Sequence, residues 1–269
     1  MEPHLVALDV DGTIVTHAGE LGERTREAIR AVADAGHEIV ISTGRSVVAT
    51  LPILRLLDLQ HGFAVCSNGA VTIRLDPTAP DGYTIDETVT FDPRQALTLV
   101  MEHAPHILVA VEEVGVGFKV ARPYPEGVLQ GEQVVVPFEE LVSRPTTRVT
   151  FHDPEGQSED FLELVERIGL HGVSYAVGYT AWLDLAPEGV SKGSALELVR
   201  RKLGIEPSHT FAAGDQRNDL EMLRWAARGV AMGQAPDEVV AAADEVTAPV
   251  EQDGLALVLE GLVGEAASA

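Results

Sequence analysis

The stretch Asp9-Val10-Asp11-Gly12-Thr13 directly follows a short apolar run, residues 4–8, and indicates where the chemistry of this chain lies. An apolar run of this length that ends in an acid is typical of a buried strand. Gly12 permits a sharp turn, and Asp11, two residues after Asp9, can face the same side as Asp9. Asp-Gly turns are common, so the stretch becomes informative only through its place at the end of a first parallel strand.

The sequence on either side of this stretch alternates between helical and strand-like patterns. The expected elements before residue 82 are helices over 22–35 and 46–57 and strands over 38–41 and 63–66. After residue 190 the alternation returns, with helices over 191–203 and 217–227 and strands over 209–213 and 229–232. This pattern predicts an α/β fold, a Rossmann-like parallel sheet with helices on both faces.

The middle of the chain has a different pattern, in which strand-like runs outnumber helices. The expected strands cover 83–91, 107–111, 117–121, 148–151, 173–177 and 181–185, and the expected helices cover 93–103 and 158–168. The turn-rich segments 76–82 and 186–189 are suitable connections to such a region. We therefore expect a core domain built from residues 1–82 and 187–269, with an inserted α+β cap domain of residues 83–186.

Composition excludes several classes of partner. The chain has 269 residues, 45% of them hydrophobic, and 19 basic against 42 acidic residues give a net charge of −23. Such a charge repels nucleic acid and anionic membranes, so neither is expected as a partner. No apolar run approaches a membrane span, no secretory signal is evident, and the single cysteine fits a reducing compartment, so the expected location is cytoplasmic. No heptad pattern argues for assembly, and the oligomeric state stays open.

The expected strand ends carry polar residues that should meet at one edge of the sheet. In parallel sheets, ligands bind outside the carboxyl ends of the strands. The residues at these ends are Asp9, Asp11, Thr43, Asn68, Asp215, Asn218 and Asp219, and Lys192 begins a helix that should pack beside them. Each one alone is weak evidence, and their convergence is what indicates a site.

The group Asp215, Asn218 and Asp219 suggests a metal site. A single acid could cap a helix, but capping does not explain a second acid and an Asn. Carboxylates from two strand ends supply the oxygen ligands that a hard cation prefers. The expected cofactor is therefore Mg2+.

Other residues have competing interpretations. Thr43 and Gly44 offer a hydroxyl and free N–H groups at a helix start, which suits a phosphate, although Thr is also an ordinary N-cap. Lys192 could equally be a solvated lysine, but its place after the second connecting segment favours a position at the functional site. Cys66 is expected in the core. We expect Trp182 to pack within the cap, and Lys119 and Arg122 to be surface charges.

Four motifs in order resemble the haloacid dehalogenase (HAD) superfamily, specifically its Cof-type phosphatases with a type IIB α+β cap. They are Asp9-Val10-Asp11-Gly12-Thr13, Ser42-Thr43-Gly44-Arg45, Lys192-Gly193 and Gly214-Asp215-Gln216-Arg217-Asn218-Asp219. The similarity covers essentially the whole chain. One departure is Gln234, where the family usually has Asn.

The resemblance implies a role for each site residue. Asp9 would be the nucleophile that forms an aspartyl-phosphate, and Asp11 the general acid and base. Mg2+ would be held by Asp9, the backbone carbonyl of Asp11, and Asp215. Asp219 would support the waters of the metal or orient Lys192. The phosphoryl oxygens would be bound by Thr43, Gly44, Lys192 and Asn218.

The expected function is a Mg2+-dependent phosphatase that hydrolyses a small phosphorylated metabolite, such as a sugar phosphate. Two alternatives stay open: a phosphomutase or dedicated sugar-phosphate phosphatase of the same fold, and a non-catalytic phosphate-binding module. A mutase would need basic cap residues for a second phosphate, and this cap is poor in Lys and Arg. The cap is expected to set substrate specificity.

Overall fold

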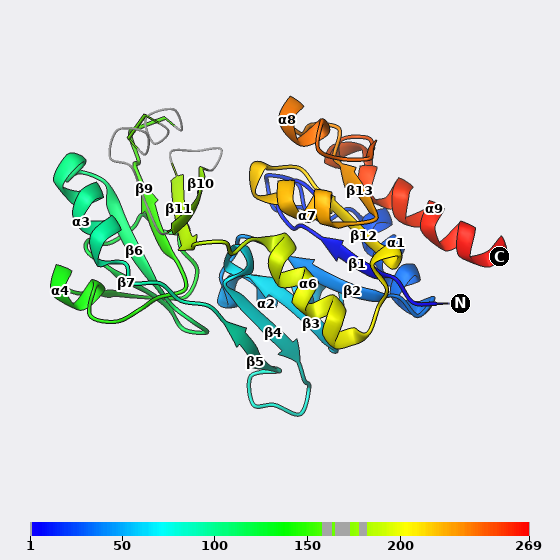
Figure 1. Ribbon diagram of the computed structural model, residues 1–269, viewed down its shortest axis with the longest axis horizontal. Helices are drawn as coiled ribbons and strands as arrows, with labels where there is room; N and C mark the ends of the chain where they lie inside the picture. The colour runs from blue at the N-terminus through cyan, green and yellow to red at the C-terminus, as the bar shows by residue number, and fades with distance from the viewer. Residues whose placement is uncertain (1, 158–162, 165–172, 178–181, 269) are drawn as a thin grey trace.

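A computed structural model describes residues 2–157, 163–164, 173–177 and 182–268, which include two sheets in two separate parts of the molecule (Figure 1). The larger sheet has the strand order β14-β13-β12-β1-β2-β3-β4-β5. Its strands are β1 (Leu5–Leu8), β2 (Glu38–Ser42), β3 (Gly62–Cys66), β4 (Val71–Leu75), β5 (Tyr83–Thr88), β12 (Thr210–Gly214), β13 (Arg228–Ala231) and β14 (Glu245–Val246). The strands from β14 to β3 pair in parallel, and β4 and β5 extend the sheet antiparallel. The predicted Rossmann-like parallel sheet is confirmed.

Helices cover both faces of this sheet because its central strands are apolar on both sides. Val6 and Leu8 belong to one core cluster, and the alternate residues Leu5 and Ala7 belong to another. The first face is covered by α1 (Glu23–Asp34), α2 (Val47–Leu56) and α9 (Gly254–Ser268). The second face is covered by α6 (Lys192–Leu203), α7 (Leu220–Trp225) and α8 (Asp237–Val240). Short 3-10 turns connect these elements at η1 (Ser67–Gly69), η2 (Pro207–His209), η3 (Arg217–Asp219) and η4 (Val250–Gln252).

The start of α6 is fixed by its own sequence. The Ser191 side chain accepts a hydrogen bond from the N–H of Ser194, and the Ser194 side chain closes a capping box onto Ser191. Such a cap satisfies backbone donors that the first turn leaves free. Gly204, with a φ of 68°, ends the helix in the left-handed region. Ser191 is therefore the N-cap of α6, and Lys192 is the first helical residue.

The second sheet has the order β10-β11-β9-β6-β7-β8 and is antiparallel except for the pair β7–β8. Its strands are β6 (Leu108–Glu113), β7 (Gly117–Val120), β8 (Glu132–Val135), β9 (Val149–His152), β10 (Val173–Val177) and β11 (Trp182–Pro187). The helices α3 (Arg94–His103) and α4 (Phe138–Leu141) cover one face, where Phe151, Leu183 and Leu185 are buried. Because strand residues alternate, the neighbouring positions Thr150 and Asp184 lie on the opposite face.

One expectation about the cap was wrong. Tyr83–Thr88 pairs with β4 in the larger sheet, so residues 76–82 form the loop of a hairpin and do not lead into the cap. The strand pattern showed that 83–88 is a strand, but not which sheet it joins, because sheet membership depends on pairing partners. The chain crosses from the larger sheet to the second sheet after Thr88 and returns after Pro187. The proposed cap therefore begins after residue 88.

Several elements were not expected from the sequence, among them β4, β8, α4 and α9. The expected helix over 158–168 falls largely outside the described residues. Among the described helices, none is long and apolar enough to cross a membrane. In Figure 1 both chain ends lie on the core side, far from the cap.

Candidate active site

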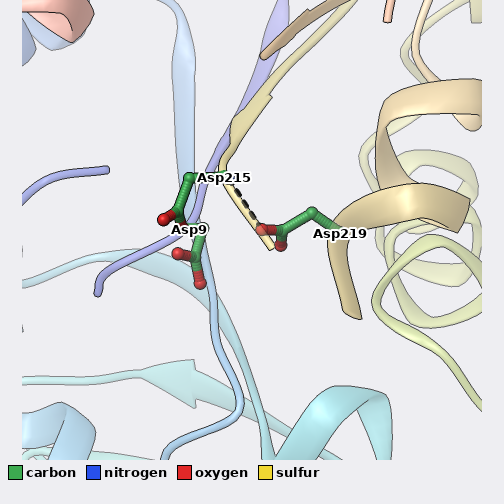
Figure 2. Close-up of side chains that lie close together, drawn as sticks. All are labelled: Asp9, Asp215 and Asp219. Carbon is green, nitrogen blue, oxygen red and sulfur yellow. Dashed lines mark hydrogen bonds between the residues drawn. The ribbon is translucent and has the colours of Figure 1, made fainter. Parts of the chain in front are cut away.

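Three buried carboxylates meet at the carboxyl edge of the parallel sheet. Asp9 follows β1 and Asp215 follows the neighbouring strand β12, while Asp219 reaches back from η3 (Figure 2). The backbone N–H of Asp9 donates to the carbonyl of Ala213 at 3.1 Å, which continues the pairing of the two strands into the site. Each carboxylate can offer one oxygen within 4.8 Å of the others. The structure thus brings these acids together from positions more than 200 residues apart in the chain.

Lys192 bridges two of these acids. Its Nζ donates to Asp9 Oδ1 and to Asp219 Oδ1, both at 2.6 Å, and the side chain is completely buried. The other oxygen of Asp219 accepts from the backbone N–H groups of Asp215 and Gln216, at 3.0 and 2.9 Å. Both oxygens of Asp219 are therefore engaged in holding Lys192 and the loop after β12.

Burial gives the acids unusual proton affinities. Desolvation raises the pKa of Asp9 well above its ordinary value. Repulsion from Asp219 raises this pKa further, and attraction to Lys192 lowers it by a smaller amount. Desolvation, with repulsion from Asp219, raises the pKa of Asp215 to about 6. Burial by itself lowers the pKa of Lys192, but attraction to Asp219 and Asp9 outweighs it, and the net shift is upward. Three carboxylates facing one ammonium leave a deficit of positive charge.

A divalent cation fits this deficit. Asp215 Oδ1 is buried and has no hydrogen-bond partner among the described residues, which is costly for a carboxylate oxygen. The second oxygen, Oδ2, accepts from Gln216 at 3.1 Å and from Gln234 at 3.3 Å, which fix the orientation of the group. A site made of oxygen donors and a carboxylate excess suits Mg2+.

Gln234 also ties the first loop to the site. Its Nε2 donates to the carbonyl of Gly12 at 2.6 Å, and its Oε1 accepts from the N–H of Val250 at 3.1 Å. One amide side chain therefore links the loop after β1, the carboxylate of Asp215 and the segment before α9. Gln234 stands where the family usually has Asn, and both its amide nitrogen and its amide oxygen make hydrogen bonds here.

Gly12 is the position where this loop tolerates no side chain. Its φ is +81°, and a Cβ would lie 2.2 Å from Asp215 Oδ2. We expect Gly12→Ala to lower the free energy of unfolding by about 3 kcal/mol, from left-handed strain plus overpacking. Gly19→Ala is a matched control, because its φ is also +81° but nothing lies within 4 Å of the added atom. Urea unfolding of both variants separates the two contributions, and equal losses would contradict the steric explanation.

Two of the expected phosphate-binding residues, Gly44 and Asn218, line the same cavity as Asp9. The Oγ1 of Thr43 accepts from the N–H of Arg45 at 3.1 Å, which shapes the turn after β2. Asn218 Nδ2 donates to Asn68 Oδ1 at 2.9 Å, and Asn68 adopts a left-handed φ of 54°. A Cβ at Gly44 would come within 3.0 Å of Asn68 Oδ1, so the turn and the asparagines are in close contact.

Asp11 lies apart from the carboxylate cluster and has a partner that the sequence did not assign. Arg45 donates from Nε to Asp11 Oδ2 at 2.9 Å and from Nη2 to Asp11 Oδ1 at 2.6 Å. This two-pronged ion pair fixes the orientation of the Asp11 carboxylate, whose side chain is 52% exposed. The only sequence signal for Arg45 was its place directly after Thr43 and Gly44.

A cavity of about 310 Å³ lies between the core and the cap. Its core side includes Asp9, Asp11 and Asn218, and its cap side includes Arg148 and Trp182. The expectation that Trp182 only packs was therefore incomplete, because it also faces the space above Asp9.

Two other cap cations are engaged away from this cavity. Arg122 donates to the carbonyls of Pro105, His106 and Ile107, and Lys119 pairs with acids of the cap. Cys66 is completely buried, and desolvation raises the pKa of its thiol to about 12, so the expectation of a core residue is confirmed.

Comparison with known proteins places this architecture in a family. A family model described as haloacid dehalogenase-like hydrolase matches residues 6–259. The pyridoxal phosphate phosphatase YbhA of Escherichia coli K12 is 30% identical over 269 residues, covering 95% of this chain and 97% of that protein. The 5-amino-6-(5-phospho-D-ribitylamino)uracil phosphatase YitU of Bacillus subtilis 168 is 26% identical over 265 residues, covering 96% and 97%. The solved HAD subclass IIB sugar phosphatase BT4131 has a TM-score of 0.81 and 27% identity, covering 96% and 98%.

The parallel sheet, with acids at its strand ends beside a second, mixed sheet, places the chain among α/β proteins with an acidic site at the sheet edge. The chain belongs to the haloacid dehalogenase-like hydrolase family, and within it to the Cof-type phosphatases with a IIB cap. It is a hydrolase of phosphoric monoesters that acts on phosphorylated small molecules.

Proposed function

We propose that this phosphatase requires Mg2+ and transfers the phosphoryl group to Asp9, forming an aspartyl-phosphate that water then hydrolyses. The observation that carries the proposal is the arrangement of Lys192, Asp9 and Asp215. Lys192 holds one oxygen of Asp9 at 2.6 Å, and a buried oxygen of Asp215 beside it lacks a hydrogen-bond partner among the described residues. A fixed carboxylate nucleophile next to an unpaired carboxylate oxygen that can bind a cation is what aspartyl phosphoryl transfer needs.

Each of the acids then has a separate task. Asp9 attacks phosphorus, and Lys192 restricts its carboxylate to one orientation. Asp11 lies at the edge of the cavity, where it pairs with Arg45 as a carboxylate. Released from Arg45 and protonated when the substrate binds, it gives that proton to the leaving oxygen and later takes one from the hydrolytic water. Asp9, Asp215 and the backbone carbonyl of Asp11 would hold Mg2+, which when bound neutralises charge on the transferring phosphoryl group.

The neutral donors complete the phosphate site. Thr43, Gly44 and Asn218 bind phosphoryl oxygens, together with the ammonium of Lys192. Asp219 orients Lys192, because both of its oxygens are already engaged. Local positive charge is needed here, because a chain with a net charge of −23 repels phosphate esters at long range.

The substrate is proposed to be a small phosphorylated metabolite. The named relatives act on pyridoxal phosphate and on a phosphorylated ribitylaminouracil, and BT4131 is called a sugar phosphatase. A phosphomutase would instead need a free cap cation for a second phosphate. Lys119 and Arg122 are both engaged within the cap, which favours hydrolysis.

The test measures inorganic phosphate released from a panel of phosphorylated metabolites with millimolar Mg2+ and with EDTA. We expect release only with Mg2+. Transfer to a second acceptor without release would favour the mutase, and binding without either would favour a non-catalytic module.

Metal binding also has a readout that does not depend on turnover. Saturating Mg2+ at about 100 times its Kd should stabilise the protein by about 2.7 kcal/mol, seen as a higher Tm. Asp215→Asn should remove this shift, because it removes the unpaired oxygen. Asp58→Asn changes an exposed acid far from the site and should keep the full shift. A shift retained in Asp215→Asn would show that the metal binds elsewhere.

A further inference from the structure

The open face of the cap sheet carries a buried ion pair between Arg148 and Asp184. Arg148 Nε donates to Asp184 Oδ1 at 3.0 Å, and its Nη2 donates to Oδ2 at 2.9 Å. Thr150 Oγ1 and Trp182 Nε1 also donate to Asp184 Oδ1, at 2.8 and 3.1 Å. Arg148 is 7% exposed and Asp184 9%, so the geometry of the pair is closely fixed.

The pair has hydrogen-bonding capacity left over. Asp184 Oδ1 accepts three bonds, whereas Oδ2 accepts only one and can take a second. The Nη1 group of Arg148 makes no hydrogen bond to any described residue. The result is a fixed guanidinium donor next to a carboxylate acceptor.

This remaining capacity lies at the cavity above the nucleophile. Arg148 and Asp184 line the cavity of about 310 Å³ that also includes Asp9. Asp184 lines a neighbouring cavity of about 190 Å³ as well, which includes Lys192 and Asn218. A group attached to a phosphate at Asp9 can therefore reach both members of the pair.

Charge and shape restrict what this group can be. The pair carries no net charge, so it offers no excess of positive charge for a second phosphate. Arg45 also lines this cavity, but its guanidinium is paired with Asp11. Phe118, Leu129 and Trp182 form an apolar wall beside the pair. Arg148 offers a hydrogen-bond donor and Asp184 an acceptor, side by side and next to an apolar wall. This arrangement suits hydroxyl groups on a compact carbon skeleton.

We propose that Arg148 and Asp184 determine specificity by binding hydroxyl groups of a neutral, polyhydroxylated leaving group. This inference rests on the proposed phosphatase function and adds to it the residues that select the substrate. A purely structural role, joining β9 to β11, is the alternative. Buried ion pairs often add little stability compared with apolar residues, so a structural role explains the pair poorly.

The experiment compares substrates that differ in their hydroxyl groups, and one pair of them is matched in size. The probes are hexose, pentose and polyol monophosphates, a hexose bisphosphate, and cyclohexylmethyl phosphate, which has the bulk of a hexose 6-phosphate without its hydroxyls. For the wild-type enzyme with Mg2+, kcat/KM for the best polyol ester should exceed that for cyclohexylmethyl phosphate by about 100-fold or more. A preference for the bisphosphate would overturn the proposal.

Variants then assign this selectivity to the pair. Arg148→Met should lower kcat/KM for the best polyol ester about 100-fold and change that for cyclohexylmethyl phosphate less than about threefold. If this variant fails to fold because Asp184 is left unpaired, the double variant Arg148→Met/Asp184→Leu removes both charges at similar volume. The double variant should show the same selective loss.

A positioning variant checks the role of the surrounding donors. Trp182→Phe keeps an aromatic wall but removes the N–H that donates to Asp184, and should raise KM for the polyol ester several-fold with little change in kcat. Equal losses on polyol ester and cyclohexylmethyl phosphate would show a structural role and overturn the inference. If the wild-type enzyme hydrolyses cyclohexylmethyl phosphate but the variants keep full selectivity, this inference fails and the proposed function stands. If the wild-type enzyme releases phosphate from no probe, both fail.

Discussion

Asp9→Asn is expected to lower kcat by at least about 10⁴-fold, because the amide cannot form the covalent phosphoryl intermediate. The neighbouring acids are already committed to other tasks. Asp215 would hold the metal through the oxygen that has no hydrogen-bond partner among the described residues. Asp219 is fully engaged by Lys192 and by two backbone N–H groups, and Asp11 is held by Arg45. The substitution therefore removes the proposed nucleophile without offering the substrate another one.

The same variant is expected to be at least as stable as the wild type when no metal is present. Burial and neighbouring acids raise the pKa of Asp9, so its ionised form is less stable in the folded protein than in water. An acid with a raised folded pKa lowers stability at neutral pH, so replacing it by a neutral amide should remove that loss. Lys192 keeps Asp219 as its partner.

Two measurements separate these effects. Phosphate release in Mg2+ gives kcat, and thermal unfolding in EDTA gives the stability of the site without cation. Asp58→Asn, at an exposed ion pair with Arg30, should leave both unchanged. Full turnover by Asp9→Asn would exclude Asp9 as the nucleophile, and a large drop in its Tm in EDTA would mean that the Lys192 bond outweighs the cost of burying the acid.

Lys192→Met is expected to destabilise the protein by about 3–5 kcal/mol and to abolish activity. The ammonium is completely buried and is shared by Asp9 and Asp219. Removing one partner of a buried ionic group leaves the other charges uncompensated, which is among the most destabilising single changes. Activity should fall with it, because Asp9 loses its fixed orientation and the phosphate loses a cation.

Lys202→Met is the matched control. Lys202 also pairs with two acids, Asp86 and Glu87, but its side chain is 40% exposed. Exposed pairs of this kind contribute at most about 1 kcal/mol. The double variant Lys192→Met/Asp219→Asn should recover part of the lost stability, because it also removes one uncompensated carboxylate. Similar losses in Lys192→Met and Lys202→Met would contradict the buried network.

Local sequence was sufficient for the residues that end the parallel strands. Asp9 and Asp215 each follow an apolar run, and the carboxyl ends of adjacent parallel strands share an edge. The helix expected over 191–203 is α6 in the structure, and Ser191 caps it through contacts within a single turn. These signals are local in the chain, so they can be read without knowing the packing.

The partners of those residues depend on packing between distant segments. Lys192 and Asp9 are separated by 183 residues, and Arg45 and Asp11 by 34. Tyr83–Thr88 has the pattern of a strand, but only pairing with β4 shows that it belongs to the larger sheet. Arg148 and Asp184 carry no motif, and they meet only because β9, which begins directly after Arg148, pairs with β11.

The opening stretch shows the division most clearly. The sequence by itself determined that Asp9 and Asp11 lie at the end of a buried parallel strand, since hydrophobic periodicity and the Asp-Gly turn are properties of neighbouring residues. Only the tertiary structure decided that Asp9 joins a buried cluster with Lys192 while Asp11 turns to Arg45 at the cavity. The physical reason is that burial and charge pairing depend on which segments pack together, and side chains two residues apart can be placed in different surroundings.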